Sequence, residues 1–169
     1  YSANGTAYTQ SAGTLSALDY ITEIRGIAWG VGATNKVYST SDVTGAWTLQ
    51  GTVGDSLFGF TDLYSCQDFL LIGKQDGLYS IDRDGAVYDV LGNYKLKPNA
   101  NNFKYGAVFK GKVYLPAHND IIEYDPLSGG VQKIGPAGYG ESSSQQHSAV
   151  ALAADPQESW LYMYGKDKS

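Results

Sequence analysis

Two sequence patterns recur along this chain of 169 residues, at intervals of about 40–45 residues. The first pattern is a short strand that carries a tyrosine, followed by a polar turn and a second short strand. Its tyrosines are Tyr1, Tyr38, Tyr79 and Tyr124. The second pattern is an apolar run, which occurs at 27–29, 69–72, 113–115 and 160–163. Because a period of this length is typical of repeat architectures, it limits the possible folds more than any other feature.

The middle unit divides into short strands at 61–65, 69–74, 78–82 and 86–91. Between them lie Gln75-Asp76-Gly77 and Arg83-Asp84-Gly85, which are typical of hairpin turns. No segment shows the sustained apolar spacing of a long helix. One four-stranded sheet cannot bury both of its faces, whereas sheets stacked radially cover each other. The sequence therefore predicts an all-β protein, a β-propeller of four-stranded antiparallel blades.

We expect a single domain over residues 1–169. Its blade units are expected at about 16–50, 60–92, 104–135, and 1–10 together with 147–169. In this arrangement the chain begins inside the third strand of a blade and stops just after a second strand, so that head and tail complete one blade. The pattern leaves open whether the units close into a ring or form an arc of a larger propeller.

One hairpin resembles the Asp-box hairpin of sialidase-type and related propellers. It consists of Val37-Tyr38-Ser39-Thr40-Ser41-Asp42 followed by Gly45-Ala46-Trp47-Thr48, with one extra residue between Asp42 and Gly45. The resemblance implies that Asp42 shapes the turn and that Trp47 packs into the core. More loosely, residues 77–82 and 111–116 resemble propellers of uncharacterised phage virion and bacterial surface proteins. That resemblance implies an extracellular location or a place on a virion surface.

The composition disfavours two classes of partner. The net charge is −5, the isoelectric point is about 4.8, and lysine and arginine form no run. Proteins that bind nucleic acid usually present a basic surface, because phosphate contacts dominate their affinity. Apolar runs such as Phe69–Ile72 are far shorter than the ~20 residues of a membrane-spanning helix. We therefore expect no nucleic-acid partner and no membrane insertion.

The chain lacks the residue sets of familiar active sites. A sialidase clamps its substrate's carboxylate with several arginines, whereas this chain has only Arg25 and Arg83, on different units. His118 and His147 are too far apart in sequence to form a metal-binding pair, and the single Cys66 allows no cysteine metal site. No Gly-x-Ser-x-Gly elbow is present. We expect no catalytic set, no metal and no cofactor.

Seven residues in turns and loops are candidates for ligand contacts, because loops on one face of a repeat scaffold commonly carry binding. They are Asp76, Tyr94, His118, Asn119, Asp120, Tyr139 and Asp167. The acidic and histidine candidates follow the second strand of successive units, where they could converge on a central pocket. The two tyrosines lie in long loops and are candidates for stacking on a sugar or a protein.

These features favour a non-enzymatic binding or structural module, extracellular or on a virion, with a protein or carbohydrate ligand. The alternative is a glycan-active propeller enzyme whose active site is completed by residues outside this chain. A lectin with identical sites between blades is disfavoured, because the aromatic and acidic positions differ from unit to unit. Further blades or chains of the same assembly, and glycosylation at Asn4 in Asn4-Gly5-Thr6, are left open.

Overall fold

The computed structural model describes residues 17–82, 84–92, 96–117, 120–135 and 147–167, with the backbone alone at 147–150 and 165–167. All regular elements in these residues are strands. They are β1 (Leu18–Ile24), β2 (Ile27–Gly32), β3 (Lys36–Thr40), β4 (Thr48–Thr52), β5 (Phe60–Cys66), β6 (Phe69–Lys74), β7 (Leu78–Ile81), β8 (Val87–Asp89), β9 (Ala107–Phe109), β10 (Lys112–Ala117), β11 (Asp120–Asp125), β12 (Gly130–Gly135), β13 (His147–Asp155) and β14 (Trp160–Asp167). The described part contains no helix that is long and apolar enough to cross a membrane.

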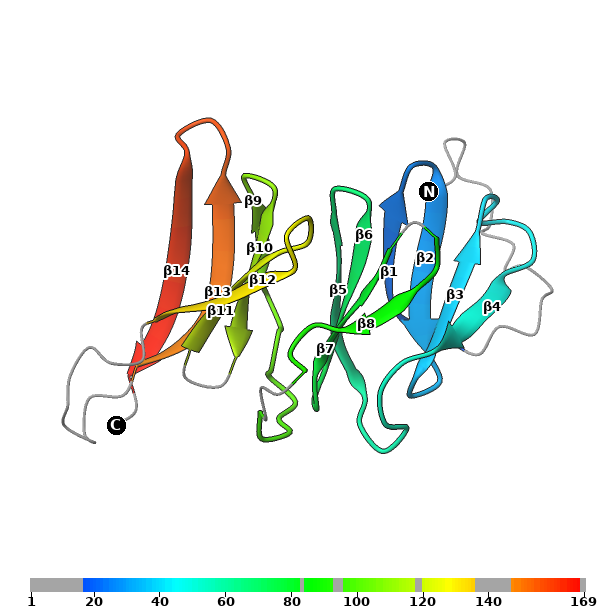
Figure 1. Ribbon diagram of the computed structural model, residues 1–169, viewed down its shortest axis with the longest axis horizontal. Coiled ribbons are helices and arrows are strands. Elements are labelled where there is room, and N and C mark those ends of the chain that lie inside the picture. The colour runs from blue at the N-terminus through cyan, green and yellow to red at the C-terminus, as the bar shows by residue number, and fades with distance from the viewer. Residues whose placement is uncertain (1–16, 83, 93–95, 118–119, 136–146, 168–169) are drawn as a thin grey trace, which may run out of the picture.

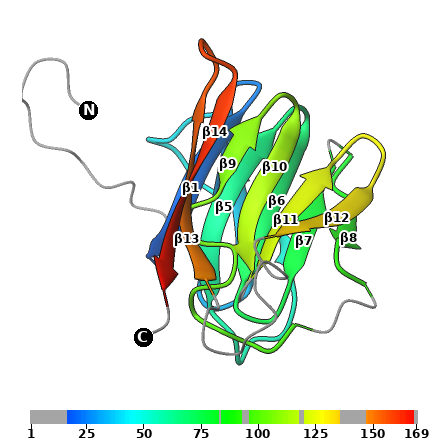
Figure 2. The same ribbon diagram turned by 90° about the vertical axis from the view of Figure 1, so that its left-hand side faces the viewer.

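The strands form one antiparallel sheet after another along the chain. β1–β4, β5–β8 and β9–β12 are four-stranded sheets in which sequential strands pair, and β13 pairs with β14. The first strands of successive sheets contact one another, β1 with β5, β5 with β9, and β9 with β13. Figures 1 and 2 show the sheets standing face to face in a row. These sheets are the blades of a β-propeller, so the predicted fold class is confirmed.

The described blades form an open arc. β1–β4 and β13–β14 lie at opposite ends of the long axis in Figure 1. The fourth sheet has two strands in the described part of the chain. The residues that were expected to complete it, 1–10, lie outside the described residues, and their role stays a prediction.

The hydrophobic core lies between neighbouring blades. In the second and third blades the second strand is the most buried element, because both of its faces meet other sheets. In β6 the side chains of Leu70, Leu71 and Ile72 are almost completely buried. Ile72 packs towards the first blade and Leu71 towards the third. Cys66 is buried in the same layer as Leu71, and burial raises the pKa of its thiol.

Aspartates shape the hairpins between the third and fourth strands of three blades. The Oδ1 atom of Asp42 accepts hydrogen bonds from Thr44 N at 2.9 Å and Thr44 Oγ1 at 2.7 Å. The Oδ1 atom of Asp125 accepts one from Leu127 N at 3.0 Å. Asp42 thus occupies the role that the Asp-box resemblance implies. Trp47 differs from the expectation, because it is only half-buried. The relation to Asp-box propellers stays a prediction.

We expect these hairpins to make the protein less stable in acid. Hydrogen bonds lower the pKa of Asp42, Asp82 and Asp125, chiefly those from Thr44, Ala86 and Ser128 respectively. A carboxylate with a lowered pKa stabilises the fold above its unfolded pKa, and this contribution disappears as the pH falls through the folded value. The urea midpoint should therefore fall between pH 5 and pH 3. This fall should be smaller in a triple Asp→Asn variant than in an Asp19→Asn control, and equal falls would contradict the account.

Candidate functional site

Four of the sequence-predicted ligand contacts lie outside the described residues. They are Tyr94, His118, Asn119 and Tyr139. These four stay predictions. The other three, Asp76, Asp120 and Asp167, lie in or next to the turns that follow the second strand of a blade.

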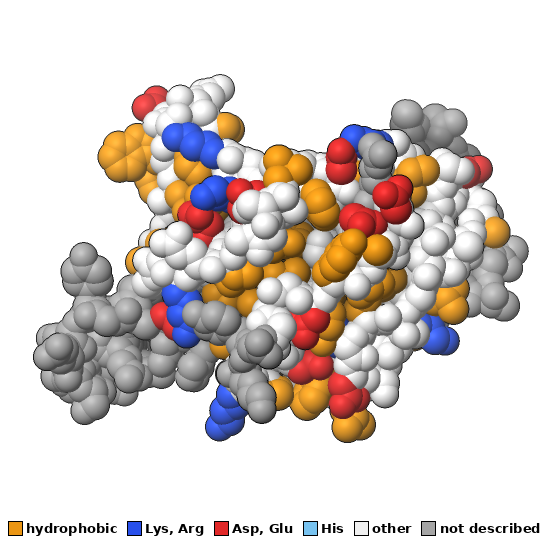
Figure 3. All heavy atoms as spheres, in the orientation of Figure 1, with side chains coloured by type: hydrophobic (Ala, Val, Ile, Leu, Met, Phe, Trp, Pro, Cys, Tyr) orange, Lys and Arg blue, Asp and Glu red, His pale blue; other side chains and the backbone are white. Residues whose placement is uncertain are grey.

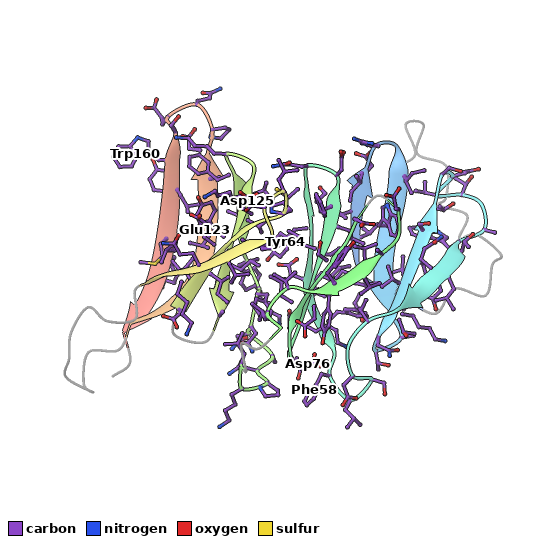
Figure 4. All side chains as sticks on the ribbon, in the orientation of Figure 1. Phe58, Tyr64, Asp76, Glu123, Asp125 and Trp160 are labelled. Atoms are coloured by element: carbon purple, nitrogen blue, oxygen red, sulfur yellow. The ribbon has the colours of Figure 1, made fainter. Side chains whose placement is uncertain are left out.

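Asp76 is held at the junction of the first two blades. It lies at the lower edge of Figure 4, close to Phe58. Its Oδ2 atom accepts a hydrogen bond from Asp55 N at 3.4 Å. Its Oδ1 atom is buried and has no partner among the described residues. Burial is the largest cause that raises the pKa of Tyr79, to about 12. The negative charge of Asp76 and its hydrogen bond with Tyr79 also raise this pKa. Asp76 therefore faces its own blade junction.

Asp120 and Asp167 have other neighbours. The Asp120 carboxylate forms an ion pair of 3.1 Å with Lys133 on β12. Asp167 is the last residue of β14, and its backbone is in register with His147. No group of three or more His, Cys, Asp or Glu residues in the described chain is placed to hold a metal ion. The carboxylate of Asp120 thus lies within its own blade and that of Asp76 at a blade junction.

A buried lysine ties the loop before the second blade to the first blade. Lys74, at the end of β6, is fully buried. Its Nζ atom donates hydrogen bonds to the carbonyl oxygens of Thr34 and Asp55, each at 3.0 Å, and of Phe58. It also lies 4.8 Å from the ring centroid of Phe60. Burial lowers the pKa of this ammonium group. Lys74 satisfies three backbone acceptors, and its role is structural.

A hollow of about 560 Å³ lies between the second and third blades. Its described lining residues are Asp68, Phe69, Asp82, Asp84, Tyr88, Asp89, Val90, Tyr124, Pro126, Leu127 and Gly129. In Figure 3 hydrophobic side chains gather at the centre of the face, between β8 and the β11–β12 hairpin, with acidic side chains beside them. We call this feature the inter-blade hollow. Its volume lies within the range of small-ligand pockets.

The acidic side of the inter-blade hollow is held in place by hydrogen bonds. Asp82 Oδ1 accepts from the backbone N of Asp84 and of Ala86, both at 2.9 Å. The Tyr88 hydroxyl donates to Asp82 Oδ2 at 2.9 Å, which also orients the ring of Tyr88. These donors lower the pKa of Asp82 and so favour its ionised carboxylate. The site therefore presents negative charge without having to rearrange.

Two other acids on this side are fixed as well. Asp89 Oδ1 accepts from Leu91 N at 3.1 Å and Gly92 N at 3.0 Å. Asp68 pairs with Arg25 of the first blade. The described lining contains no lysine or arginine. Arg83, which separates Asp82 from Asp84 in the chain, lies outside the described residues.

Apolar side chains from both hairpins also line the inter-blade hollow and reach the surface. Tyr88 is 50% exposed and Leu127 is 73% exposed, one on each of the two hairpins that border the hollow. Tyr124 and Pro126 continue the apolar lining from the third blade. Aromatic faces and carboxylates both attract cations, and an apolar wall accommodates the stem of a long basic side chain. The arrangement suits a positively charged group on an apolar stem.

The sequence alone did not indicate this site. Asp82-Arg83-Asp84-Gly85 resembles the start of a calcium loop but lacks its distal acidic ligand, so its sequence favours a hairpin turn. Leu127 lies 45 residues after Asp82 in the chain. The sequence did contain one signal for this site. The hairpin between the third and fourth strands of the neighbouring units also carries an aspartate followed by an apolar residue. Only the packing of two blades brings the two hairpins to one hollow.

Comparisons with known proteins identify the fold and nothing narrower. No protein-family model and no curated protein matches this chain. Among solved structures, the extracellular domain of the one-component system BT4673 from Bacteroides thetaiotaomicron aligns with a TM-score of 0.60 at 13% identity, over 86% of this chain and 21% of that one. An auxiliary nutrient binding protein from the same organism aligns at 0.55 and 10% identity, over 87% of this chain and 35% of that one.

The designed protein Ika4 aligns with a TM-score of 0.58 at 15% identity, over 94% of this chain and 98% of that one. The chain thus spans about a fifth and about a third of the two Bacteroides proteins and nearly the whole of Ika4. At these identities the likeness shows the fold alone. The chain folds as a β-propeller.

Proposed function

We propose that this chain is a non-enzymatic binding module whose inter-blade hollow takes a protein segment carrying lysine or arginine beside an apolar residue. The observation that carries the proposal is the pairing of fixed carboxylates with an exposed apolar wall. Asp82 and Asp89 are held by backbone donors, while Tyr88 and Leu127 stand exposed beside them. A preorganised site of this kind binds without the cost of ordering its own side chains.

We also propose that the module acts outside the cell, on a cell surface or a virion. Two observations support this location. One of the similar structures is described as an extracellular domain and another as a nutrient binding protein. The likeness of residues 77–82 and 111–116 to surface and virion propellers points the same way. Detection of the native protein only in the cytoplasmic fraction of its source would contradict this location.

The binding test uses one peptide and its uncharged counterpart. The probe is a fluorescein-labelled peptide with the core Arg-Leu-Arg, and the counterpart carries citrulline in place of both arginines. We expect the arginine peptide to bind at least tenfold more tightly, a difference of about 1.4 kcal/mol. Fluorescence anisotropy measures both affinities. Binding should weaken as salt is raised, because the carboxylates are near the surface.

Two substitutions locate the binding. Leu127→Ser removes part of the apolar wall, and Tyr88→Ala removes an exposed ring together with the hydroxyl that holds Asp82. Each substitution should weaken binding of the arginine peptide about tenfold. Leu57→Ser is the matched control, since Leu57 is also exposed but does not line the hollow. Equal affinity for both peptides, or equal losses in all three variants, would contradict the proposal. If a neutral oligosaccharide bound where the peptide did not, and Tyr88→Ala abolished this binding, the ligand would be a carbohydrate and not a protein segment.

A further inference from the structure

The inter-blade hollow has three aromatic side chains among its described lining residues, in addition to its carboxylates. Phe69 is the first residue of β6, Tyr88 lies on β8 and Tyr124 lies on β11. Tyr124 is buried, Phe69 is half-buried and Tyr88 is half exposed, so aromatic side chains line both the buried and the exposed parts of the hollow. The face of an aromatic ring carries partial negative charge and attracts cations. The rings and the carboxylates therefore favour the same kind of ligand group.

The oxygen atoms of the acidic lining already accept hydrogen bonds from the protein itself. Oδ1 of Asp82 accepts from two backbone N–H groups, and Oδ2 accepts from the Tyr88 hydroxyl. Oδ1 of Asp89 likewise accepts from two backbone N–H groups, and Oδ2 of Asp68 pairs with Arg25. These acids thus supply negative charge, while much of their capacity to accept further hydrogen bonds is already used.

A cation that has no hydrogen-bond donors of its own fits this environment best. An ammonium group has three N–H donors and a guanidinium group has five. Each donor loses its water partner on entering the hollow, and burial of a donor without a new acceptor is unfavourable. A trimethylammonium group has no N–H to satisfy. It keeps the positive charge and presents methyl groups to the aromatic faces.

The apolar part of the lining accommodates the stem of a lysine side chain. Val90, Pro126 and Leu127 line the hollow together with the rings, and hydrophobic side chains gather at the centre of this face in Figure 3. The methylene groups of lysine can lie along such a surface while the charged end reaches the carboxylates. A phosphocholine group fits less well, because its phosphate would meet an acidic lining that has no lysine or arginine among its described residues. These features favour a methylated lysine over a lipid headgroup.

We propose that the inter-blade hollow recognises trimethyllysine in a protein segment, with Phe69, Tyr88 and Tyr124 contacting the methyl groups and the nearby carboxylates supplying the opposite charge. This inference rests on the proposed function, because it names the form of the basic side chain that the module binds. In a site that acted through charge alone, unmodified lysine would bind at least as well, since its ammonium group is the more compact charge. The preference for the methylated side chain is thus what distinguishes the two.

Three versions of one fluorescein-labelled peptide test the proposal. Its core is Lys-Leu, and the lysine is unmodified, trimethylated, or replaced by a residue whose side chain ends in an uncharged tert-butyl group. We expect the trimethylated peptide to bind about tenfold more tightly than either of the other two, as measured by fluorescence anisotropy. Equal affinity for the trimethylated and tert-butyl versions would show recognition of shape without charge and would overturn the proposal.

The same assay distinguishes the failure of this inference from the failure of the proposed function. If the arginine peptide bound more tightly than its citrulline counterpart but trimethylation of lysine gave no gain, the proposed function would stand and the preference for trimethyllysine would be overturned. If no cationic peptide bound, both would be overturned. Phosphocholine should compete with the trimethylated peptide only weakly. Competition by phosphocholine at a lower concentration than the unlabelled peptide requires would overturn the assignment to a protein segment.

Two variants at Tyr88 separate its aromatic face from its hydroxyl. Tyr88→Phe and Tyr88→Leu both lose the hydrogen bond to Asp82, but only Tyr88→Phe keeps the ring. Tyr88→Phe should retain the preference for trimethyllysine over lysine, whereas Tyr88→Leu should reduce it to about threefold or less. Leu57→Ser, outside the hollow, should leave the preference unchanged, and the unfolding temperature of each variant checks its fold. A full preference in Tyr88→Leu would overturn the role of the aromatic ring.

Discussion

Replacing Lys74 with methionine is expected to lower the free energy of unfolding by about 3–5 kcal/mol, because each buried acceptor left without a donor costs about 1–3 kcal/mol. Methionine has a similar length but no donor, and the substitution leaves the carbonyl oxygens of Thr34, Asp55 and Phe58 without their hydrogen bonds. These three acceptors belong to the turn of the first blade and the loop that leads into the second. Urea unfolding followed by tryptophan fluorescence measures the loss.

Lys36→Met is the matched control, because Lys36 is exposed on β3. The effect of Lys36→Met on the free energy of unfolding should stay within about 0.5 kcal/mol.

Lys74 should also make the stability of the protein depend on pH. Burial lowers its pKa below the 10.5 of the unfolded chain, so the unfolded state holds more protons between the two values. Stability should therefore rise with pH as it approaches 10.5 in the wild type and not in Lys74→Met. A Lys74→Met protein as stable as the Lys36→Met control would contradict the structural role.

Replacing Phe103 with alanine is expected to destabilise the protein by about 3–5 kcal/mol, the usual cost of removing a buried phenylalanine ring. Phe103 is completely buried in the core between the second and third blades, although it belongs to a loop. Its backbone N donates to Pro116 O at 2.6 Å. A Cβ atom placed on Gly73 of β6 would lie 2.9 Å from Phe103 Cβ, which shows how closely the loop approaches the strand. Chemical denaturation at pH 7 measures the effect.

Tyr105→Ala is a close control for Phe103→Ala. Both residues lie in the same loop with a left-handed backbone, at φ of 56° for Tyr105 and 64° for Phe103. Tyr105 is exposed, however, and its removal leaves no cavity. The change should therefore be within about 0.5 kcal/mol. If both variants lost the same stability, the backbone of the loop and not the buried ring would account for the effect.

The repeat made the fold predictable from the sequence. The position of the repeated tyrosine along its strand varies between units, and this variation explains why the exact strand register was not predicted. Tyr38 is in register with Gly30 and Tyr79 with Ile72, each the fourth residue of the second strand. Tyr124 is in register with Val113, the second residue of β10, so its match to the other two is shifted by two positions. Because side chains alternate with a period of two, such a shift keeps the residue on the same face. The pattern therefore identified strands and faces while missing the exact register.

The candidate site was far less predictable. Asp76 accepts a hydrogen bond from Asp55 N and Asp120 pairs with Lys133, and their expected contact with a ligand stays a prediction. Lys74 was interpreted only as a strand residue, and nothing in its local sequence indicates three carbonyl partners. The inter-blade hollow requires two hairpins from different blades to come together. Local sequence encodes each hairpin, but not the distance between them.

Mapping of amide chemical shifts on addition of the arginine peptide shows which residues contact the ligand. The largest changes should fall on residues 84–90 and 124–129, which border the inter-blade hollow. The citrulline peptide should leave the same residues unchanged. Changes centred on residues 75–77 and 96–102 would contradict this proposal and place the ligand at the turn after β6 and the loop between β8 and β9. The sequence-predicted candidates Asp76, Tyr94 and His118 would then be its nearest contacts.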